Sequence, residues 1–277
     1  MDDFLRTLED GRVFVDYGPT SMVITAKSGN EMLSELAAAA FPLIRDALAE
    51  IAESLPVLRQ YPKDGDFSGL SGLPLVMAQA ALATEEPTLT PMATVAGTVA
   101  DAVADWIYAR GADFVLVNNG GDIALRLGEG KSVRMGILPD LNGSITQVVT
   151  IHAEDGIGGV CTSGLGGRSF TRGIASSVSV FSARCAIADA CATHLANCSY
   201  IRSPRVHTCL AGELDSESDI ADLTVVHSVD VLTEEEKQQG ISLILQETQK
   251  QFNKGNLQYM AADIQSCRAW YPRPMAD

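Results

Sequence analysis

Apolar residues recur at helical spacing in several stretches of the chain, the longest of them between residues 31 and 54. Pro42 lies inside this stretch and is expected to kink or split the helix, because proline lacks the amide that the helical ladder needs. Other segments alternate apolar and polar residues, which is typical of strands. Further helices are predicted over 75–83, 90–110, 183–197 and 233–252, and strands over 12–17, 22–26, 114–127, 132–138, 145–153, 176–181 and 222–228.

The predicted strands follow one another in hairpins instead of alternating singly with helices. This order favours an α+β fold, in which antiparallel β-sheet meanders pack against helices. Residues 114–127, 132–138 and 145–153 are predicted to form one such meander. The length of 277 residues suits a single domain over 1–277 with a large core. The segment after the last predicted helix is expected to be an irregular C-terminal extension.

The first candidate site lies in the strongest hairpin signal of the chain. Two β-rich runs flank Asn118-Asn119-Gly120-Gly121, and Asn-Gly pairs are typical of tight hairpin turns. The turn accounts for Asn119 and Gly120. It does not account for Asp122, which begins an apolar strand although aspartate has a poor strand propensity.

A second candidate site is the glycine-rich stretch 158–167, which contains the adjacent residues Thr162, Ser163 and Gly164. Glycines let backbone amides approach an anion closely, so this segment is a candidate phosphate-binding turn. The alternative is a glycine-rich hairpin connection that binds no ligand.

A third candidate site lies on the predicted helix 183–197. Asp189 and Thr193 are four residues apart, so their side chains share one helix face and can reach one hard cation together. The alternative is a solvated aspartate and a threonine bonded to its own backbone. On the helix 90–110, the small residues Ala93, Ala96, Gly97 and Ala100 are interpreted as close packing, and Asp101 and Asp105 are expected to face solvent.

These segments together resemble the ApbE family of FAD:protein FMN transferases. The family carries N-x-G-G-D, T-S-G and A-D-A-x-A-T in this order, and the chain has them at 118–122, 162–164 and 188–193. The family's helix motif G-A-x-x-K-G-x-x-x-D is similar to residues 92–101, but Ala96 stands where the family has lysine. The family's segment H-x-x-D-P-x-x-G is missing. The resemblance, over about 90–200, points to a shorter branch related to ApbE.

The resemblance implies an ApbE-like fold and a flavin nucleotide, FAD or FMN, bound with Mg²⁺. It assigns the side chains of Asp189 and Thr193 and the carbonyl of Ala93 to the metal. It places Asn119, Gly120, Gly121 and Asp122, with Thr162, Ser163 and Gly164, around the nucleotide. No residue is assigned to catalysis. Three functions stay open: a Mg-dependent FMN transferase or FAD pyrophosphate-cleaving enzyme, a non-catalytic nucleotide-binding protein, and an unrelated small-molecule enzyme on the same scaffold.

The net charge and the targeting signals limit which binding partners and which cellular compartment are expected. The net charge of −15 disfavours binding to nucleic acid or to an anionic membrane. The acidic run 213–236 contains no Lys or Arg and is interpreted as a solvated surface segment. Neither a secretion signal nor an apolar run of membrane-spanning length is recognisable, so a cytoplasmic protein with reduced cysteines is expected. The expected partner is a small nucleotide ligand, and a homo-oligomer is left open.

Overall fold

The computed structural model describes residues 4–137, 147–167 and 169–272. Its central feature is a ten-stranded sheet in which every neighbouring pair is antiparallel. The strand order is β1 (Leu5–Thr7), β2 (Val13–Tyr17), β3 (Thr20–Ser28), β5 (Phe114–Asn119), β6 (Asp122–Leu127), β9 (Gly159–Ser163), β10 (Ser177–Ser182), β13 (Tyr259–Ile264) and β14 (Cys267–Tyr271), while β4 (Glu31–Met32) pairs with β3. The predicted α+β class with antiparallel strands is confirmed.

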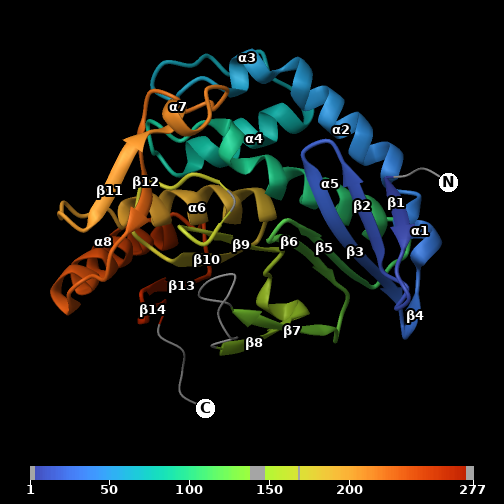
Figure 1. Cartoon of the computed structure of the whole chain (residues 1–277). Helices are drawn as coiled ribbons and strands as arrows, with labels where there is room; N and C mark the ends of the chain where they lie inside the picture. Colours follow the sequence, from blue (N-terminus) through green and yellow to red (C-terminus); the bar gives the residue numbers. More distant parts are fainter. Residues whose placement is uncertain (1–3, 138–146, 168, 273–277) are drawn as a thin grey trace.

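Helices cover one face of this sheet (Figure 1). They are α1 (Ser34–Ala38), α2 (Phe41–Glu53), α3 (Leu55–Leu58), α4 (Gly72–Ala83), the 3₁₀ turn η1 (Pro91–Thr94), α5 (Val95–Tyr108), α6 (Cys185–Cys198) and α8 (Glu234–Asn253). Pro42 lies in the first turn of α2, where proline is tolerated, so the predicted split of the first helical stretch is confirmed. The main core lies between helices and sheet, with Ile24, Val117, Val180 and Leu195 fully buried.

The opposite face of the sheet carries a separate hairpin of β7 (Ser132–Ile137) and β8 (Gln147–His152). The prediction that these strands continue one meander with β5 and β6 is therefore wrong. The place next to β6 is taken by β9, and the hairpin instead buries Ile151 against Leu125 and Phe181 on the sheet. Predicted strand residues 138 and 145–146 lie outside the described residues.

The C-terminal segment is not an irregular extension, and that prediction is wrong for the described residues. Strands β13 and β14 form a hairpin that adds to β10 at the end of the main sheet. Met260 and Ile264 are fully buried there, and Trp270 packs on Tyr259 with ring centroids 5.9 Å apart. The run Met260-Ala261-Ala262 has a weak strand propensity, and tertiary pairing overrides it. Another unpredicted strand, β11 (Val206–Leu210), pairs with β12 (Thr224–Val229), and the short α7 (Ala211–Leu214) follows β11.

Two further observations concern the chain as a whole. All six cysteines are free thiols. Within the described ranges, none of the helices combines the length and the apolar character needed to cross a membrane.

Candidate functional site

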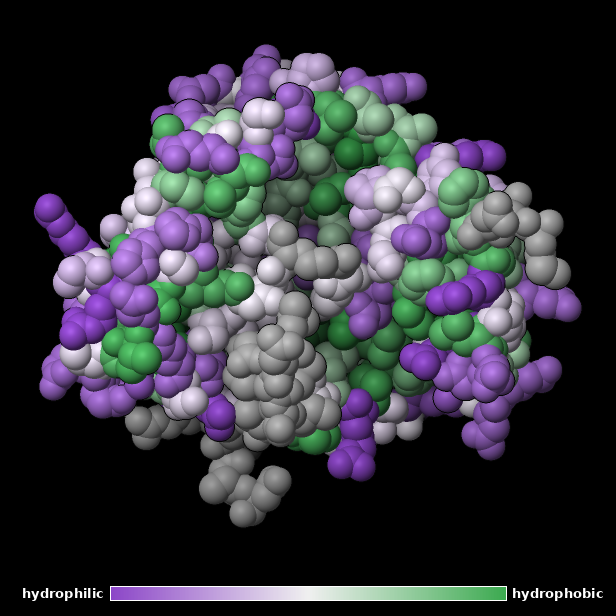
Figure 2. All heavy atoms as spheres, viewed as in Figure 1, coloured by the Kyte–Doolittle hydropathy of each residue, from purple (hydrophilic) through white to green (hydrophobic). Residues whose placement is uncertain are grey.

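A two-part cleft lies between α6, η1 with the start of α5, and the loops that surround them. The face of the molecule seen in Figure 1 is hollowed near its centre, with apolar side chains on its upper wall (Figure 2). The larger compartment has a volume of about 390 Å³ and the smaller one about 210 Å³. Both compartments share Val95, Ala96, Asp122 and Ser169, so they adjoin.

The β5–β6 hairpin reaches this cleft in the form that the sequence predicts. Asn119 pairs with Asp122 across a two-residue turn, and Gly120 and Gly121 both have positive φ angles of 71° and 114°. Such angles are what a tight hairpin turn requires of glycine. The Asn119 amide donates to the Ala96 carbonyl at 3.2 Å, which ties the turn to the start of α5. Asn119, Gly120 and Asp122 line the smaller compartment, whereas Gly121 lines neither.

The glycine-rich stretch is only partly a turn. Its first half is strand β9, which is buried except at Thr162, and the turn begins at Gly164. Thr162 lines the smaller compartment, and its hydroxyl bonds to that of Ser179 at 2.7 Å. Ser163 is buried in the strand, and Gly164 has a φ of 140° with no space for a Cβ beside the Ser176 carbonyl. Ser163 and Gly164 therefore line neither compartment.

Helices α5 and α6 cap each other's first turns. The Gly97 amide of α5 donates to Asp189 Oδ2 at 2.9 Å, and the Ala186 amide of α6 donates to Asp101 Oδ2 at 3.0 Å. First-turn amides have no partner within their own helix, so each carboxylate satisfies a group that would otherwise be unpaired. The helices can approach this closely because residue 97 is glycine: a Cβ there would lie 2.6 Å from the Cys185 carbonyl oxygen.

Asp101 is enclosed by arginines, so the expectation that it faces solvent is wrong. Its side chain is buried and pairs with Arg126 at 2.7 Å and Arg184 at 3.4 Å. Arg126 also bonds to Asp105 at 2.5 Å, and Arg184 to Asp105 at 2.7 Å. Burial alone would raise the pKa of Asp105, but the hydrogen bonds from the two guanidinium groups outweigh it and the pKa is lowered. This cluster is an ion-pair network that is buried at Asp101 and Arg126 and half-exposed at Asp105 and Arg184.

Asp189 has a different environment, although it is also buried. Burial and, second, the charge of Asp122 raise its pKa well above the usual value, against the opposing effect of the Gly97 hydrogen bond. Its Oδ1 has no hydrogen-bond partner among the described residues, and Asp189 lines the larger compartment. A carboxylate in this position is costly to ionise unless a cation compensates it.

The other two predicted metal ligands also line the larger compartment. Thr193 lies one turn beyond Asp189 on α6, and Ala93 lies in η1, directly before α5. In a regular α-helix the Gly97 amide would donate to the Ala93 carbonyl. Here it donates to Asp189 instead, so the Ala93 carbonyl does not receive that hydrogen bond. No group of three or more His, Cys, Asp or Glu in the described ranges is placed to hold a metal by itself. The oxygen donors present fit Mg²⁺, which takes one or two carboxylates and completes its shell with water and phosphate.

Several lining residues were not predicted from the sequence. The loop after α7 contributes Asp215, Ser218 and Asp219 to the larger compartment, although the acidic run was interpreted as solvated surface. Asp219 accepts a hydrogen bond from Thr90. Arg172 and Asn197 also line the cavity. The signal for Asn197 was available, because it continues the spacing of Asp189 and Thr193 by four residues; Arg172 and the acidic loop reach the cavity only through the tertiary fold.

Comparison with known proteins places the chain in a family. The family model described as "AbpE bacteria" matches residues 5–267, and the chain belongs to this family. The membership of an ApbE-like superfamily that the motifs predicted is thereby confirmed.

The relatives in sequence are UPF0280 proteins of archaea. The chain is 34% identical over 125 residues to that of Methanothermobacter thermautotrophicus and 38% identical over 108 residues to that of Methanosarcina acetivorans. These matches cover 45% and 39% of this chain, and the chain spans about half the length of these relatives, 48% and 42%. The UPF0280 protein of Methanococcoides burtonii is 30% identical over 180 residues, which are 65% of this chain and 74% of that protein.

Solved structures of flavin transferases share part of the architecture at low sequence identity. The flavin transferase ApbE from Vibrio cholerae has a TM-score of 0.43 and 15% identity, with 66% of this chain and 85% of that chain covered. The flavinyl transferase ApbE from Pseudomonas stutzeri has a TM-score of 0.42 and 15% identity, with 70% and 87% covered.

Proposed function

We propose that the chain binds a flavin nucleotide, FAD or FMN, together with Mg²⁺ in the larger compartment, and that it cleaves the pyrophosphate of FAD as a Mg-dependent enzyme of the FMN-transferase type. One observation carries the proposal: Asp189, Thr193 and the Ala93 carbonyl, which motif resemblance assigns to a metal, line one cavity next to the Asn119–Asp122 hairpin. The raised pKa of Asp189 supports a cation there, because the ionised carboxylate lacks a cationic partner among the described residues.

The position of each of these residues suggests its role. Asp189 holds its Oδ2 on the Gly97 amide, so Oδ1 keeps a fixed direction into the cavity. Thr193 and Ala93 supply neutral oxygens, which bring no further charge to a cavity that four aspartates already line. The Asn119–Asp122 turn is fixed to α5 and limits where the ligand can lie. Bound Mg²⁺ would neutralise negative charge on the two phosphate groups whose shared phosphorus–oxygen bond breaks.

A second candidate, a non-catalytic nucleotide-binding protein, is favoured by a different observation. Among the described residues that line the two compartments there is no histidine and no lysine. The residues available for proton transfer are therefore carboxylates and hydroxyls. A binding protein would keep the metal site and leave FAD intact.

Calorimetric titration of Mg²⁺ and FAD, singly and together, into wild type and Asp189→Asn tests the binding, and chromatography for AMP and FMN tests cleavage. We expect FAD to bind with Mg²⁺, and Asp189→Asn to weaken that binding by about tenfold or more, since it keeps the shape and loses the charge. Asp46→Asn, which removes an exposed carboxylate on α2, is the charge-matched control and should bind like wild type. Binding without release of AMP would select the second candidate. Absence of FAD binding, or equal binding by Asp189→Asn, would contradict both.

A further inference from the structure

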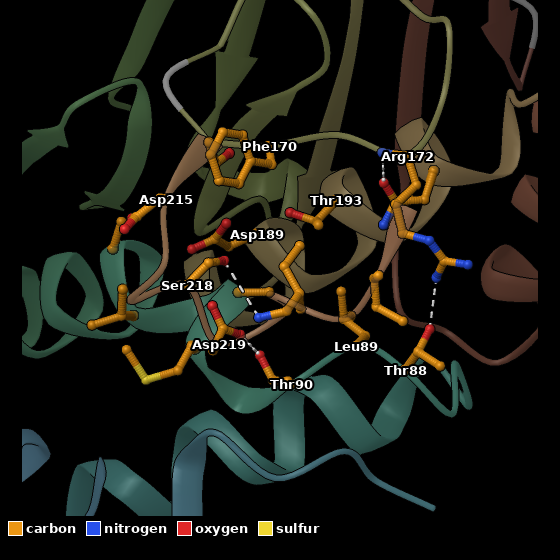
Figure 3. A pocket seen from close by; sticks show the side chains of 18 of the residues that line it. Thr88, Leu89, Thr90, Phe170, Arg172, Asp189, Thr193, Asp215, Ser218 and Asp219 are labelled. Atoms are coloured by element: carbon orange, nitrogen blue, oxygen red, sulfur yellow. Dashed lines mark hydrogen bonds between the residues drawn. The ribbon is translucent and has the colours of Figure 1, made fainter. Parts of the chain in front are cut away.

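The larger compartment has an acidic end and a basic end. Asp189, Asp215 and Asp219 lie toward one side in the close view, and Arg172 lies toward the other beside Thr88 (Figure 3). Among the described residues that line this cavity, Arg172 is the single Lys or Arg. A cavity with this division of charge suits a ligand that brings a cation to one end and an anion to the other.

Arg172 is held in place by contacts that leave most of its hydrogen-bonding capacity unused. Its Nη1 donates to Thr88 Oγ1 at 2.7 Å, and its backbone amide donates to Asn197 Oδ1 at 2.8 Å. Nε and Nη2 have no partner within the described part of the chain. The side chain is 36% exposed, so these donors are accessible to a ligand.

The neighbouring carboxylate, Glu86, does not satisfy this guanidinium group. The distance from Arg172 Nη1 to Glu86 Oε1 is 3.8 Å, which is beyond hydrogen-bond range. Glu86 Oε1 instead accepts from the Thr88 hydroxyl at 2.5 Å and from the Thr88 amide at 3.2 Å. The loop that carries Thr88 thus orients the guanidinium through the threonine hydroxyl.

The two ends of the cavity are separated along α6. Asp189, Thr193 and Asn197 follow one another at four-residue intervals, and all three line the cavity. Eight residues of helix correspond to about 12 Å. A diphosphate held at Asp189 and Thr193 therefore leaves the Asn197 and Arg172 end for another part of the ligand.

We propose that Arg172 is a specificity-determining residue, which binds a second anionic group of the nucleotide, a phosphate or a carboxylate separate from its pyrophosphate. The forked donors of arginine match the paired oxygens of either group. That the pyrophosphate binds at the acidic end rests on the proposed function. That Arg172 prefers an anion does not depend on it. FAD carries no anionic group besides its pyrophosphate, so the preferred ligand is a more acidic nucleotide, and FAD binds at the same metal site without a partner for Arg172.

The test uses two matched pairs of pyrophosphate compounds, titrated calorimetrically into the whole chain with Mg²⁺ present. NADP⁺ and NAD⁺ differ by a remote phosphate, and UDP-glucuronate and UDP-glucose differ by a remote carboxylate. We expect wild type to bind the more acidic member of at least one pair about tenfold more tightly, the effect of one charge-assisted hydrogen-bonded contact. The pair that shows the preference identifies the anion as phosphate or carboxylate.

Variants separate this role from a structural one. Arg172→Gln should abolish the preference while NAD⁺ and UDP-glucose bind as to wild type, and Arg172→Lys should retain part of it, because the charge remains and the fork is lost. Arg205→Gln, which removes an exposed arginine outside the cavity, should change neither. Equal binding within both pairs, no binding of any of the four compounds, or a preference that survives Arg172→Gln would overturn the proposal. Asp189→Asn in the same titrations should weaken all four; if it does not while the preference persists, the proposed metal site fails and the role of Arg172 stands.

Discussion

Asp101 on α5 and Asp189 on α6 make the same kind of contact to the neighbouring helix, but their other partners differ. Both are buried, and each accepts a backbone hydrogen bond from the first turn of the other helix. Asp101 also pairs with Arg126 and Arg184, whereas Asp189 directs its second oxygen into the cavity. Asp101 therefore has arginine partners that satisfy its charge inside the protein. Within the described residues Asp189 has no such partner, which is why we propose Asp189, and not Asp101, as the ligand-binding carboxylate.

The largest expected effect concerns the Asp101 side of this comparison. Asp101→Ala leaves Arg126 paired with Asp105 alone and removes the acceptor of the buried Ala186 amide. A buried donor that loses its partner costs about 1–3 kcal/mol of the free energy of unfolding. Urea denaturation of the variant and of the exposed control Asp46→Ala measures this, and the control should lie within about 0.5 kcal/mol of wild type. If Asp101→Ala were as stable as wild type, the proposed structural role of Asp101 would be wrong.

The smaller effect concerns the pH dependence of stability at Asp189. Its pKa is raised in the folded state, so the folded protein holds this proton more tightly than the unfolded chain does. The stability that protonation provides is complete below the unfolded pKa and is lost as the pH rises through the folded pKa. Asp189→Asn keeps an acceptor for the Gly97 amide and cannot ionise, so it should gain stability relative to wild type as the pH rises from about 4 toward 8.

Urea denaturation of both proteins across this pH range, without and with Mg²⁺, provides the measurement. Added Mg²⁺ should reduce the difference at the upper end, since the metal binds the ionised carboxylate and releases its proton. A difference in stability that does not change with pH would mean that Asp189 is already compensated in the folded protein.

The sequence predicts features that depend only on residues close together in the chain. The turn at Gly120 and Gly121 follows from the need for positive φ, and the four-residue spacing of Asp189 and Thr193 places both on one side of α6. What it does not predict depends on packing between distant segments. Asp101 is buried because Arg126 and Arg184 come from other elements, and β13 forms because β10 offers an open edge.

The same reason explains which site residues were missed. Arg172 and the Asp215–Asp219 loop reach the cavity through chain folding, so their spacing in the sequence carries no signal. Conversely, Ser163 and Gly164 match a family motif, but the pairing of β9 with β10 directs them away from both compartments.

We propose that Asp189 holds a divalent cation and that Asp101 does not. The most direct measurement is anomalous diffraction from crystals of the chain soaked with Mn²⁺ and ADP, because Mn²⁺ accepts the oxygen ligands of Mg²⁺ and can be located by its scattering. We predict a peak within bonding distance of Asp189 Oδ1 and the Thr193 hydroxyl, and its disappearance in Asp189→Asn crystals. A peak at another site only, or none in wild type while ADP is bound in the cavity, would contradict the claim.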